Sequence, residues 1–374
     1  MKKTMKPLLN LLIASAALMT ATVQGHELLV GSYTDGASQG LYRYRYSDGR
    51  IDPQPLQVMA ASNPSWLTLS ADRRGLWVVN EQAAGGVSAF SLDPARRLAL
   101  LNQVSSQGAE PTHSSLSHDG RFLFVANYGG SNAEGGSLSV LPVKADGQLG
   151  AVVQQFRHAA SKVNAERQAT PHVHSAVPSP DGRYLFASDL GADRVFRYRY
   201  DGAAVQPLSA VDSLALPPGS GPRHLWFGTD GRHAYLTLEM TAQVAVFDYH
   251  DGDLKLIQSL PLTDSDDPAA KAAGAVHGSA DGRFLYVSNR GKANQLLVFA
   301  IDPADGRLTL LQRRSVEGDH PREFVIDPGQ NFVLVANQNS ERIVVIRRDP
   351  LTGLLGDVVQ SLEQAAPSDL KFID

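Results

Sequence analysis

SHDGRFLFVANY, residues 117–128, joins a tight Asp-Gly turn to a run of apolar and aromatic residues. The same pattern recurs along the chain, and successive copies begin 47 to 62 residues apart. The copies are SADRRGLWVVNE (70–81), SPDGRYLFASDL (179–190), GTDGRHAYLTLE (228–239), SADGRFLYVSNR (279–290), DPGQNFVLVANQ (327–338) and, without its turn, ELLVGSYT (27–34). A repeat of this length is typical of β-propeller blades.

Each copy is one strand of a larger unit. A second strand follows it, such as AQVAVFDY (242–249), and then a third, such as LKLIQSLP (254–261). An inner strand like PSWLTLS (64–70) precedes most copies; the first copy lacks one, and PSDLKFID (367–374) supplies it. The sequence therefore predicts an all-β, seven-bladed β-propeller in which the C-terminal strand completes the N-terminal blade and closes the ring.

The first 25 residues differ from the rest of the chain. Lys2, Lys3 and Lys6 precede the apolar run LLNLLIASAALMTA (8–21), and small residues follow. This layout predicts a secretory signal peptide over residues 1–25, leaving a single propeller domain over 26–374. The apolar run is too short to span a membrane, and no later stretch approaches that length. We therefore expect an exported protein of the periplasm, without membrane insertion.

Charge and composition exclude several function classes. Loss of three lysines with the leader changes the formal net charge from −4 to −7, which argues against a nucleic-acid partner. The chain has no cysteine, so disulfides, thiol catalysis and Cys-based zinc sites are excluded. No GxSxG, HExxH or GxxxxGK[ST] motif is present. A hydrolase of this sequence would use water as its nucleophile.

The segment GPRHLWFGTDGRHAYLTLEM (221–240) predicts where chemistry is concentrated. Because inner strands line the channel, the start of one strand and the end of the next meet at the same mouth. With Asp230-Gly231 as a two-residue turn, Pro222 pairs with Glu239 and Arg223 lies diagonal to that carboxylate. The two side chains are then close enough to share a ligand.

Equivalent positions in the other blades are rich in polar side chains, which predicts a ligand site at this mouth. Strand starts supply Trp66, His113, His172, His174, Arg223, His224, His320, Arg322 and Asp369. Strand ends supply Tyr33, Glu81, Tyr128, Asp189, Glu239, Arg290 and Gln338. The loops 131–136, 154–171 and 262–274 are expected to border it. The opposite end carries repetitive Asp-Gly-Arg turns that have an ordinary structural explanation.

Each of these signals has a plainer alternative. Glu239 could form a structural ion pair, and the arginines could form salt bridges between blades. Together, Arg223, Arg290 and Arg322 favour an anion or oxyanion site. His172 and His174 lie on one side of a strand and could bind a metal, but no third ligand has convincing spacing. No cofactor is expected, and a divalent metal is the minor alternative.

The whole mature chain resembles the seven-bladed lactonase family, which includes propeller-type 6-phosphogluconolactonase and carboxymuconate cyclase. The segments that carry the resemblance include PTHSSLSHDGRFLFVANYGG (111–130), PHVHSAVPSPDGRYLFASDLGADRV (171–195) and HPREFVIDPGQNFVLVANQNS (320–340). The resemblance implies an active site containing His174, Arg223, Glu239 and Arg290, with Arg322 and His113 as further pocket positions, and no cofactor required by the family as a class. From their strand positions, His172, His224, Tyr128 and Gln338 are expected to contact substrate.

This resemblance leads to a mechanistic hypothesis. Glu239 would act as the general base, oriented by Arg223, while Arg290 and Arg322 polarise the lactone carbonyl. His174 would protonate the leaving ring oxygen, although either His174 or Glu239 could serve as the base.

Export favours glucono-1,5-lactone, hydrolysed to gluconate, over a cytoplasmic sugar phosphate. A 6-phosphogluconolactonase or a muconate-type lactonising enzyme is the first alternative. A non-catalytic propeller that binds protein or glycan is the second. The sequence leaves the oligomeric state open.

Overall fold

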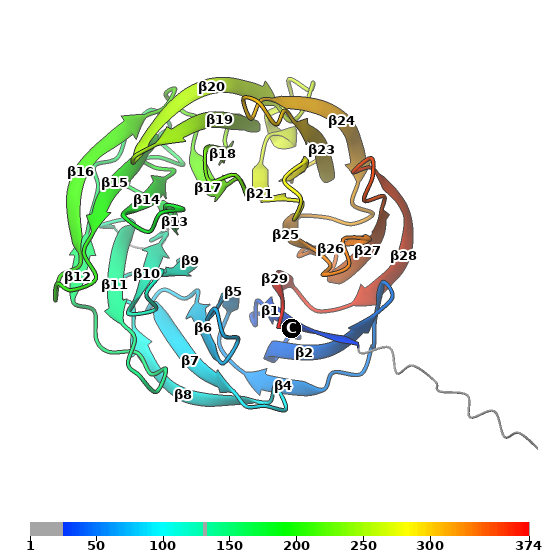
Figure 1. The fold of residues 1–374 in the computed structure, drawn as a ribbon, viewed down its shortest axis with the longest axis horizontal. Coiled ribbons are helices and arrows are strands. Elements are labelled where there is room, and N and C mark those ends of the chain that lie inside the picture. The colour runs from blue at the N-terminus through cyan, green and yellow to red at the C-terminus, as the bar shows by residue number, and fades with distance from the viewer. Residues whose placement is uncertain (1–24, 130–132, 374) are drawn as a thin grey trace, which may run out of the picture.

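The computed structural model describes residues 25–129 and 133–373. Within them, 29 strands form seven antiparallel sheets that radiate from a central channel (Figure 1). The predicted all-β, seven-bladed propeller is confirmed. The predicted signal peptide lies outside the described residues apart from Gly25. No described helix is long and apolar enough to cross a membrane.

The blades are numbered I to VII in chain order, and each contains its strands from the channel outward. Blade I comprises β29 (Pro367–Phe372), β1 (His26–Ser32), β2 (Gly40–Ser47), β3 (Arg50–Ile51) and β4 (Gln57–Ala60). Blade II comprises β5 (Pro64–Leu69), β6 (Gly75–Asn80), β7 (Gly86–Leu92) and β8 (Leu98–Ser105). Blade III comprises β9 (Pro111–Leu116), β10 (Phe122–Asn127), β11 (Ser137–Pro142) and β12 (Gln154–Phe156). Blade IV comprises β13 (Val173–Pro178), β14 (Tyr184–Asp189), β15 (Arg194–Tyr200) and β16 (Leu208–Ala215).

The remaining blades repeat the same order. Blade V comprises β17 (Pro222–Phe227), β18 (His233–Leu238), β19 (Gln243–His250) and β20 (Asp253–Pro261). A short 3-10 turn (Pro268–Ala270) separates it from blade VI. Blade VI comprises β21 (Ala273–Gly278), β22 (Phe284–Asn289), β23 (Gln295–Ile301) and β24 (Leu308–Ser315). Blade VII comprises β25 (Pro321–Ile326), β26 (Phe332–Asn337), β27 (Arg342–Arg348) and β28 (Leu355–Glu363).

The two ends of the chain meet in blade I, as the sequence predicts (Figure 1). The C-terminal strand β29 pairs antiparallel with β1, placing Leu370 opposite Val30 and Phe372 opposite Leu28. Leu370 is buried with Val30 in the cluster that joins blade I to blade VII. The innermost strand of the first blade is therefore the last strand of the chain, and the ring has no open edge between its ends.

Apolar side chains fill the spaces between neighbouring blades, because each sheet is covered on both faces. Seven clusters of buried residues are distributed around the ring. One contains Tyr235 and Val246 of blade V packed on Val287 and Phe299 of blade VI. This two-sided burial explains why the central strands of the blades read as nearly continuous apolar runs.

The inner hairpin turns are longer than predicted. In blade V, Gly228 N–H donates to His233 O at 2.8 Å, which leaves four residues in the loop instead of two. The carboxylate of Asp230 accepts from the N–H groups of Arg232 and His233, and Gly231 has φ +64°. Glycine takes this left-handed conformation without steric cost. The prediction of a two-residue turn was therefore wrong. The strand register that was predicted from it is nevertheless the one observed from Leu225 to Phe227.

A register shift occurs near the start of every inner strand. In blade V the shift lies between Pro222 and Leu225, so that Pro222 pairs with Leu238 and not with the predicted Glu239. Such a bulge adds one residue to a strand and redirects a side chain. The same shift occurs in the other six blades, at Ser65, Thr112, His174, Gly274, Arg322 and Ser368. The bulged residues of the seven blades therefore form a ring of side chains at the channel mouth, which simple strand alternation does not predict.

Candidate active site

A polar cavity of about 250 Å³ lies where the inner strands begin and their partners end. Eight of its ten lining residues are charged or are histidines. It is lined by Glu81, Glu110, Thr112, Tyr128, Arg167, His174, Glu239, Arg290, His320 and Arg322. The structure thus brings together Glu239, His174, Arg290, Arg322 and Tyr128 of the predicted site residues.

Glu239 is surrounded by three arginines. Its Oε2 atom lies 2.7 Å from Arg290 Nη2 and 3.1 Å from Arg223 Nε, and its Oε1 atom lies 2.7 Å from Arg167 Nη2. The predicted proximity of Arg223 and Glu239 is therefore confirmed. Because β18 ends at Leu238, Glu239 follows directly after the strand and projects into the mouth, where the bulge in β17 brings Arg223 to it.

These ion pairs set the charge of Glu239. Burial alone would raise the pKa of the carboxyl, but the guanidinium groups of Arg290 and Arg223 outweigh burial and hold the pKa well below its usual range. Burial, followed by repulsion from Arg290, lowers the pKa of Arg223 to about 9. Both groups are therefore charged at neutral pH.

His174 occupies the bulge in β13 and lines the same cavity. Burial and the neighbouring charge of Arg223 lower its pKa well below 6.5, so the imidazole is neutral at pH 7. Its Nδ1 atom is buried and has no hydrogen-bond partner among the described residues. A neutral imidazole keeps one ring nitrogen unprotonated and can accept a proton there.

The other side of the cavity is formed by Arg322 and its partners. Arg322 Nη2 lies 3.5 Å from Glu81 Oε2, and its guanidinium carbon lies 5.3 Å from the ring centre of Tyr33. Tyr33 donates its hydroxyl hydrogen to the same Glu81 oxygen at 2.8 Å. Arg290 is fixed by its Nε and Nη2 groups, which donate to the carbonyl oxygens of Ala272 and Ala273.

Arg167 is a site residue that strand periodicity did not reveal. It belongs to the loop 154–171, which was expected to border the site, and its side chain is 44% exposed. Arg167 Nη2 also donates to the Tyr128 hydroxyl at 3.2 Å. The turn that presents it is held by Asn164, whose side-chain oxygen accepts from Arg167 N–H, and by Gln168, which donates to Leu190 O. A loop has no repeat from which side-chain direction can be inferred; Glu110 and Thr112 were missed as well.

Four predicted contact residues do not line this cavity. His113 and His224 follow the bulge and line a separate cavity deeper in the channel. His172 stacks on Tyr128 with ring centres 4.5 Å apart, and its Nδ1 lies 2.9 Å from Tyr128 O. Gln338 is half-buried and is not among the residues that line the mouth cavity. For His113 and His224 the reason is the bulge, which changes which side chains point to each level of the channel. That any of these four contacts substrate stays a prediction.

The two histidines considered as metal ligands diverge. The ring of His172 contacts Tyr128 O and Thr170 Oγ1, whereas His174 lines the cavity. Residues 25–129 and 133–373 contain no group of three or more histidine, aspartate or glutamate side chains placed to hold a metal ion.

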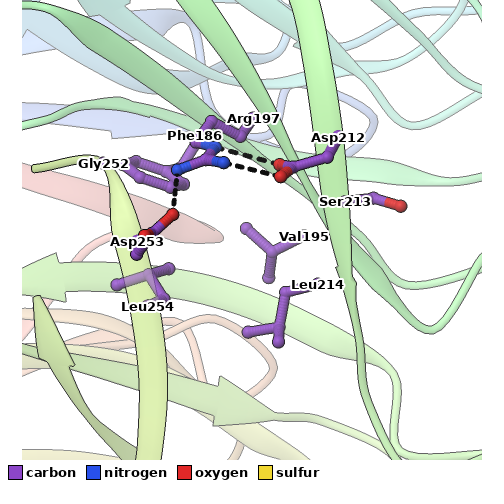
Figure 2. Close-up of a pocket in the computed structure, with 9 residues that line it drawn as sticks. All are labelled: Phe186, Val195, Arg197, Asp212, Ser213, Leu214, Gly252, Asp253 and Leu254. Atoms are coloured by element: carbon purple, nitrogen blue, oxygen red, sulfur yellow. Dashed lines mark hydrogen bonds and ion pairs between the residues drawn. The ribbon is translucent and has the colours of Figure 1, made fainter.

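A further hollow of about 210 Å³ lies on the outer rim between blades IV and V (Figure 2). Arg197 crosses it, donating through Nε and Nη2 to Asp212 at 2.9 and 2.6 Å and pairing through Nη1 with Asp253. Phe186, Val195, Leu214 and Leu254 form its apolar floor (Figure 2). Because the only arginine of this hollow is already bound to two carboxylates across the blade boundary, we interpret it as a structural clamp.

Comparison with known proteins agrees with this architecture. The family model described as "Lactonase, 7-bladed beta-propeller" matches residues 27–372. The solved structure of a periplasmic gluconolactonase from Pseudomonas aeruginosa is 51% identical, with a TM-score of 0.90, and the match covers 94% of this chain and 99% of that chain.

Curated relatives include the 6-phosphogluconolactonase of Bacillus subtilis, 31% identical over 350 residues, which span 92% of this chain and 97% of the relative. The 6-phosphogluconolactonase of Formosa agariphila is 33% identical over 354 residues, with 92% and 99% coverage. The chain therefore belongs to the family of seven-bladed β-propeller lactonases, enzymes that open lactones with water.

Proposed function

We propose that this protein hydrolyses an uncharged sugar lactone, with glucono-1,5-lactone and its product gluconate as the leading candidates. The observation that carries the proposal is the charge balance of the mouth cavity. Its lining contains three arginines and three glutamates. Each of the arginines contacts a glutamate: Arg167 and Arg290 share Glu239 with Arg223, and Arg322 lies beside Glu81.

Paired arginines favour a neutral substrate over a phosphorylated or carboxylated one. A phosphate group needs cations whose charge is not already compensated, as well as several donors in a suitable geometry. Here a dianion would have to compete with buried glutamates for the same guanidinium groups. A neutral lactone can instead use the arginines as hydrogen-bond donors while their ion pairs remain. The similar Pseudomonas aeruginosa protein is described as a periplasmic gluconolactonase, which supports the same choice.

The proposed mechanism uses three elements of the cavity. Neutral His174 takes a proton from the attacking water and returns it to the ring oxygen that leaves when the lactone opens. The Glu239 carboxylate stabilises the imidazolium formed in between, and Arg290 and Arg322 donate to the carbonyl oxygen as it gains negative charge. No step requires a cofactor.

This assignment differs from the sequence-based hypothesis, in which Glu239 was the first choice as base and His174 the alternative. Both oxygens of Glu239 are engaged by guanidinium groups at 3.1 Å or less, and its pKa is held low. A proton on Glu239 would also leave several buried arginines without a counter-charge. These contacts favour His174 as the proton acceptor.

We further propose that residues 1–25 direct export to the periplasm and are then removed. The basic start and short apolar run support this, and so does the periplasmic description of the Pseudomonas aeruginosa relative. Because sugar phosphates are intermediates of the cytoplasm, export favours an unphosphorylated lactone as the substrate.

A direct comparison of two lactones tests the substrate. The protein lacking residues 1–25 is expected to hydrolyse glucono-1,5-lactone with a kcat/KM about tenfold or more above that for its 6-phospho derivative, because the phosphate would have to compete with Glu239 and Glu81 for the guanidinium groups. Acid release, corrected for spontaneous opening, gives both values. A preference for the phosphorylated lactone would reverse the substrate proposal. Spontaneous rates with both compounds would instead support a binding module.

Replacing Arg167 with methionine tests the role of the loop. Glu239 must be ionised for activity, so activity is lost as the pH falls through its pKa. Removing one of its three cationic partners raises that pKa, and the acidic limb of the kcat profile should move to higher pH. Arg167→Lys, which keeps the charge, should restore the original limb. An unchanged profile in Arg167→Met would show that the ion pair does not influence the reaction.

A further inference from the structure

The channel contains a second and larger cavity at the end opposite the mouth. Its volume is about 420 Å³, and Arg73, from a hairpin turn, marks its outer side. Its lining comes from six of the inner strands, and its polar and aromatic side chains include Trp66, Thr68, His113, His224, Trp226, His277 and Lys371. This size falls within the range of ligand pockets. In the sequence, this end shows only the repetitive Asp-Gly-Arg turns, so a cavity there was not expected.

An aromatic cluster separates the two cavities. Trp66 and His113 have ring centres 4.4 Å apart, and Trp66 and His224 are 5.2 Å apart. On its other side, His224 is 5.2 Å from His174 of the mouth cavity. The second cavity is therefore a distinct chamber whose inner wall touches the proposed catalytic residue through His224.

The charged groups inside this chamber are already paired, whereas Arg73, at its outer side, is exposed to solvent. Lys371 Nζ lies 2.8 Å from Asp369 Oδ1 and 4.5 Å from the centre of the Trp66 ring. His277 Nε2 lies 2.6 Å from Glu323 Oε1, which is itself buried. Like the mouth, the chamber therefore favours a ligand without net charge.

The chamber retains hydrogen-bonding capacity. Its wall also contains two buried polar atoms, His224 Nε2 and Ser115 Oγ, that have no hydrogen-bond partner among the described residues. His113 Nδ1 accepts from Ala176 N–H at 3.4 Å, and burial lowers the pKa of His113 to about 3. The ring proton of this neutral imidazole is therefore on Nε2, where it can be donated.

Trp226 provides an aromatic surface at the outer part of the chamber. Its six-membered ring lies directly against Gly278 of blade VI, where a Cβ atom would come within 2.2 Å of it. Two of the three tryptophans in the chain line this one chamber, whereas Trp77 lies elsewhere and donates to Gly147 O. A half-buried indole held by a glycine in the next blade is a positioned surface and not an incidental exposure.

We propose that this chamber is a second binding site, for a neutral sugar ring, separate from the catalytic mouth. Apolar ring faces of the sugar would pack on Trp226, and its hydroxyl groups would meet the imidazoles of His113, His224 and His277. This site does not depend on which lactone the mouth hydrolyses. It would allow a free sugar to contact the wall that carries His224, next to His174.

Fluorescence titration with D-glucose tests the proposal, because two of the three tryptophans report on the chamber. The intact mature protein and Trp77→Phe should both show a saturable change in emission. Trp226→Ala, which removes the aromatic surface, and Val177→Phe, which fills the chamber, should bind about tenfold more weakly or worse. Lactone turnover in these two variants, which lie outside the catalytic cavity, should stay close to that of the unmodified protein and so report an intact fold.

Glu239→Gln separates the two cavities. If glucose binds the chamber, this variant should keep the affinity of the unmodified protein. Loss of glucose binding in Glu239→Gln but not in Val177→Phe would place the sugar in the mouth and overturn the proposal. The absence of any saturable change up to about 100 mM glucose would overturn it as well.

Discussion

Glu239→Gln should lower kcat for lactone hydrolysis by about 10²- to 10⁴-fold while the propeller stays folded. The carboxylate is the shared partner of Arg167, Arg223 and Arg290, and in the proposed mechanism it stabilises the imidazolium of His174. Glutamine keeps the shape of the side chain but removes that charge. The cation on His174 would then form among guanidinium groups with no compensating anion, which raises the barrier to proton transfer.

Steady-state kinetics on glucono-1,5-lactone measure this effect, and circular dichroism confirms the fold. Glu341→Gln, an exposed exchange of the same kind, is the matched control and should leave kcat unchanged. His174→Ala distinguishes the two roles, because added imidazole should restore part of its activity if His174 carries the proton. Near-normal turnover by Glu239→Gln would contradict the assigned role of the carboxylate.

Deleting residues 367–374 should abolish cooperative folding. The deletion removes β29, which forms the innermost strand of blade I, and leaves β1 as an open edge beside the channel. Leu370 leaves the cluster it shares with Val30, so the contact between blades I and VII is lost with the strand. The expected cost is comparable to the whole stability of a typical domain, about 5–15 kcal/mol.

A circular permutant is the control for this truncation. Because β29 runs antiparallel to β1 and Ile373 N–H donates to Glu27 O, residues 367–374 can be placed before His26 through a short glycine linker. This arrangement turns the closing pair into a hairpin and should restore a cooperative thermal transition. A truncated protein that unfolds at the same temperature as the intact chain would show that ring closure contributes little to stability.

Local repetition explains why the fold was predictable. The turn and strand pattern of SADGRFLYVSNR (279–290) depends on neighbours in the sequence, and its recurrence determines the number of blades. The segment ELLVGSYT (27–34) lacks an inner strand before it, and residues 367–372 form an inner strand with no blade of its own. The two can only be combined in one blade, and the structure shows that pairing. Positions at strand starts and strand ends likewise placed Glu239, His174, Arg290 and Arg322 at one mouth.

The finer geometry of the site was not predictable in the same way. His113 and His224 lie near strand starts, as His174 does, but they follow the bulged residue of their strands and line the next level of the channel. A bulge leaves little trace in the hydrophobic pattern, because it adds one residue at the point where the strand leaves the core. Arg167 was missed for a different reason, since its loop has no period and its contact with Glu239 spans two blades.

The sequence by itself determined the seven-fold repeat, the closing strand and the concentration of ionisable side chains at one end, because these depend on local pattern and on counting strands. Only the tertiary structure decided which arginines compensate which glutamates, and that the channel is divided by Trp66, His113 and His224 into two chambers. Those properties arise where seven inner strands from distant parts of the chain converge, and the distances between strands at the axis are not encoded in any one blade.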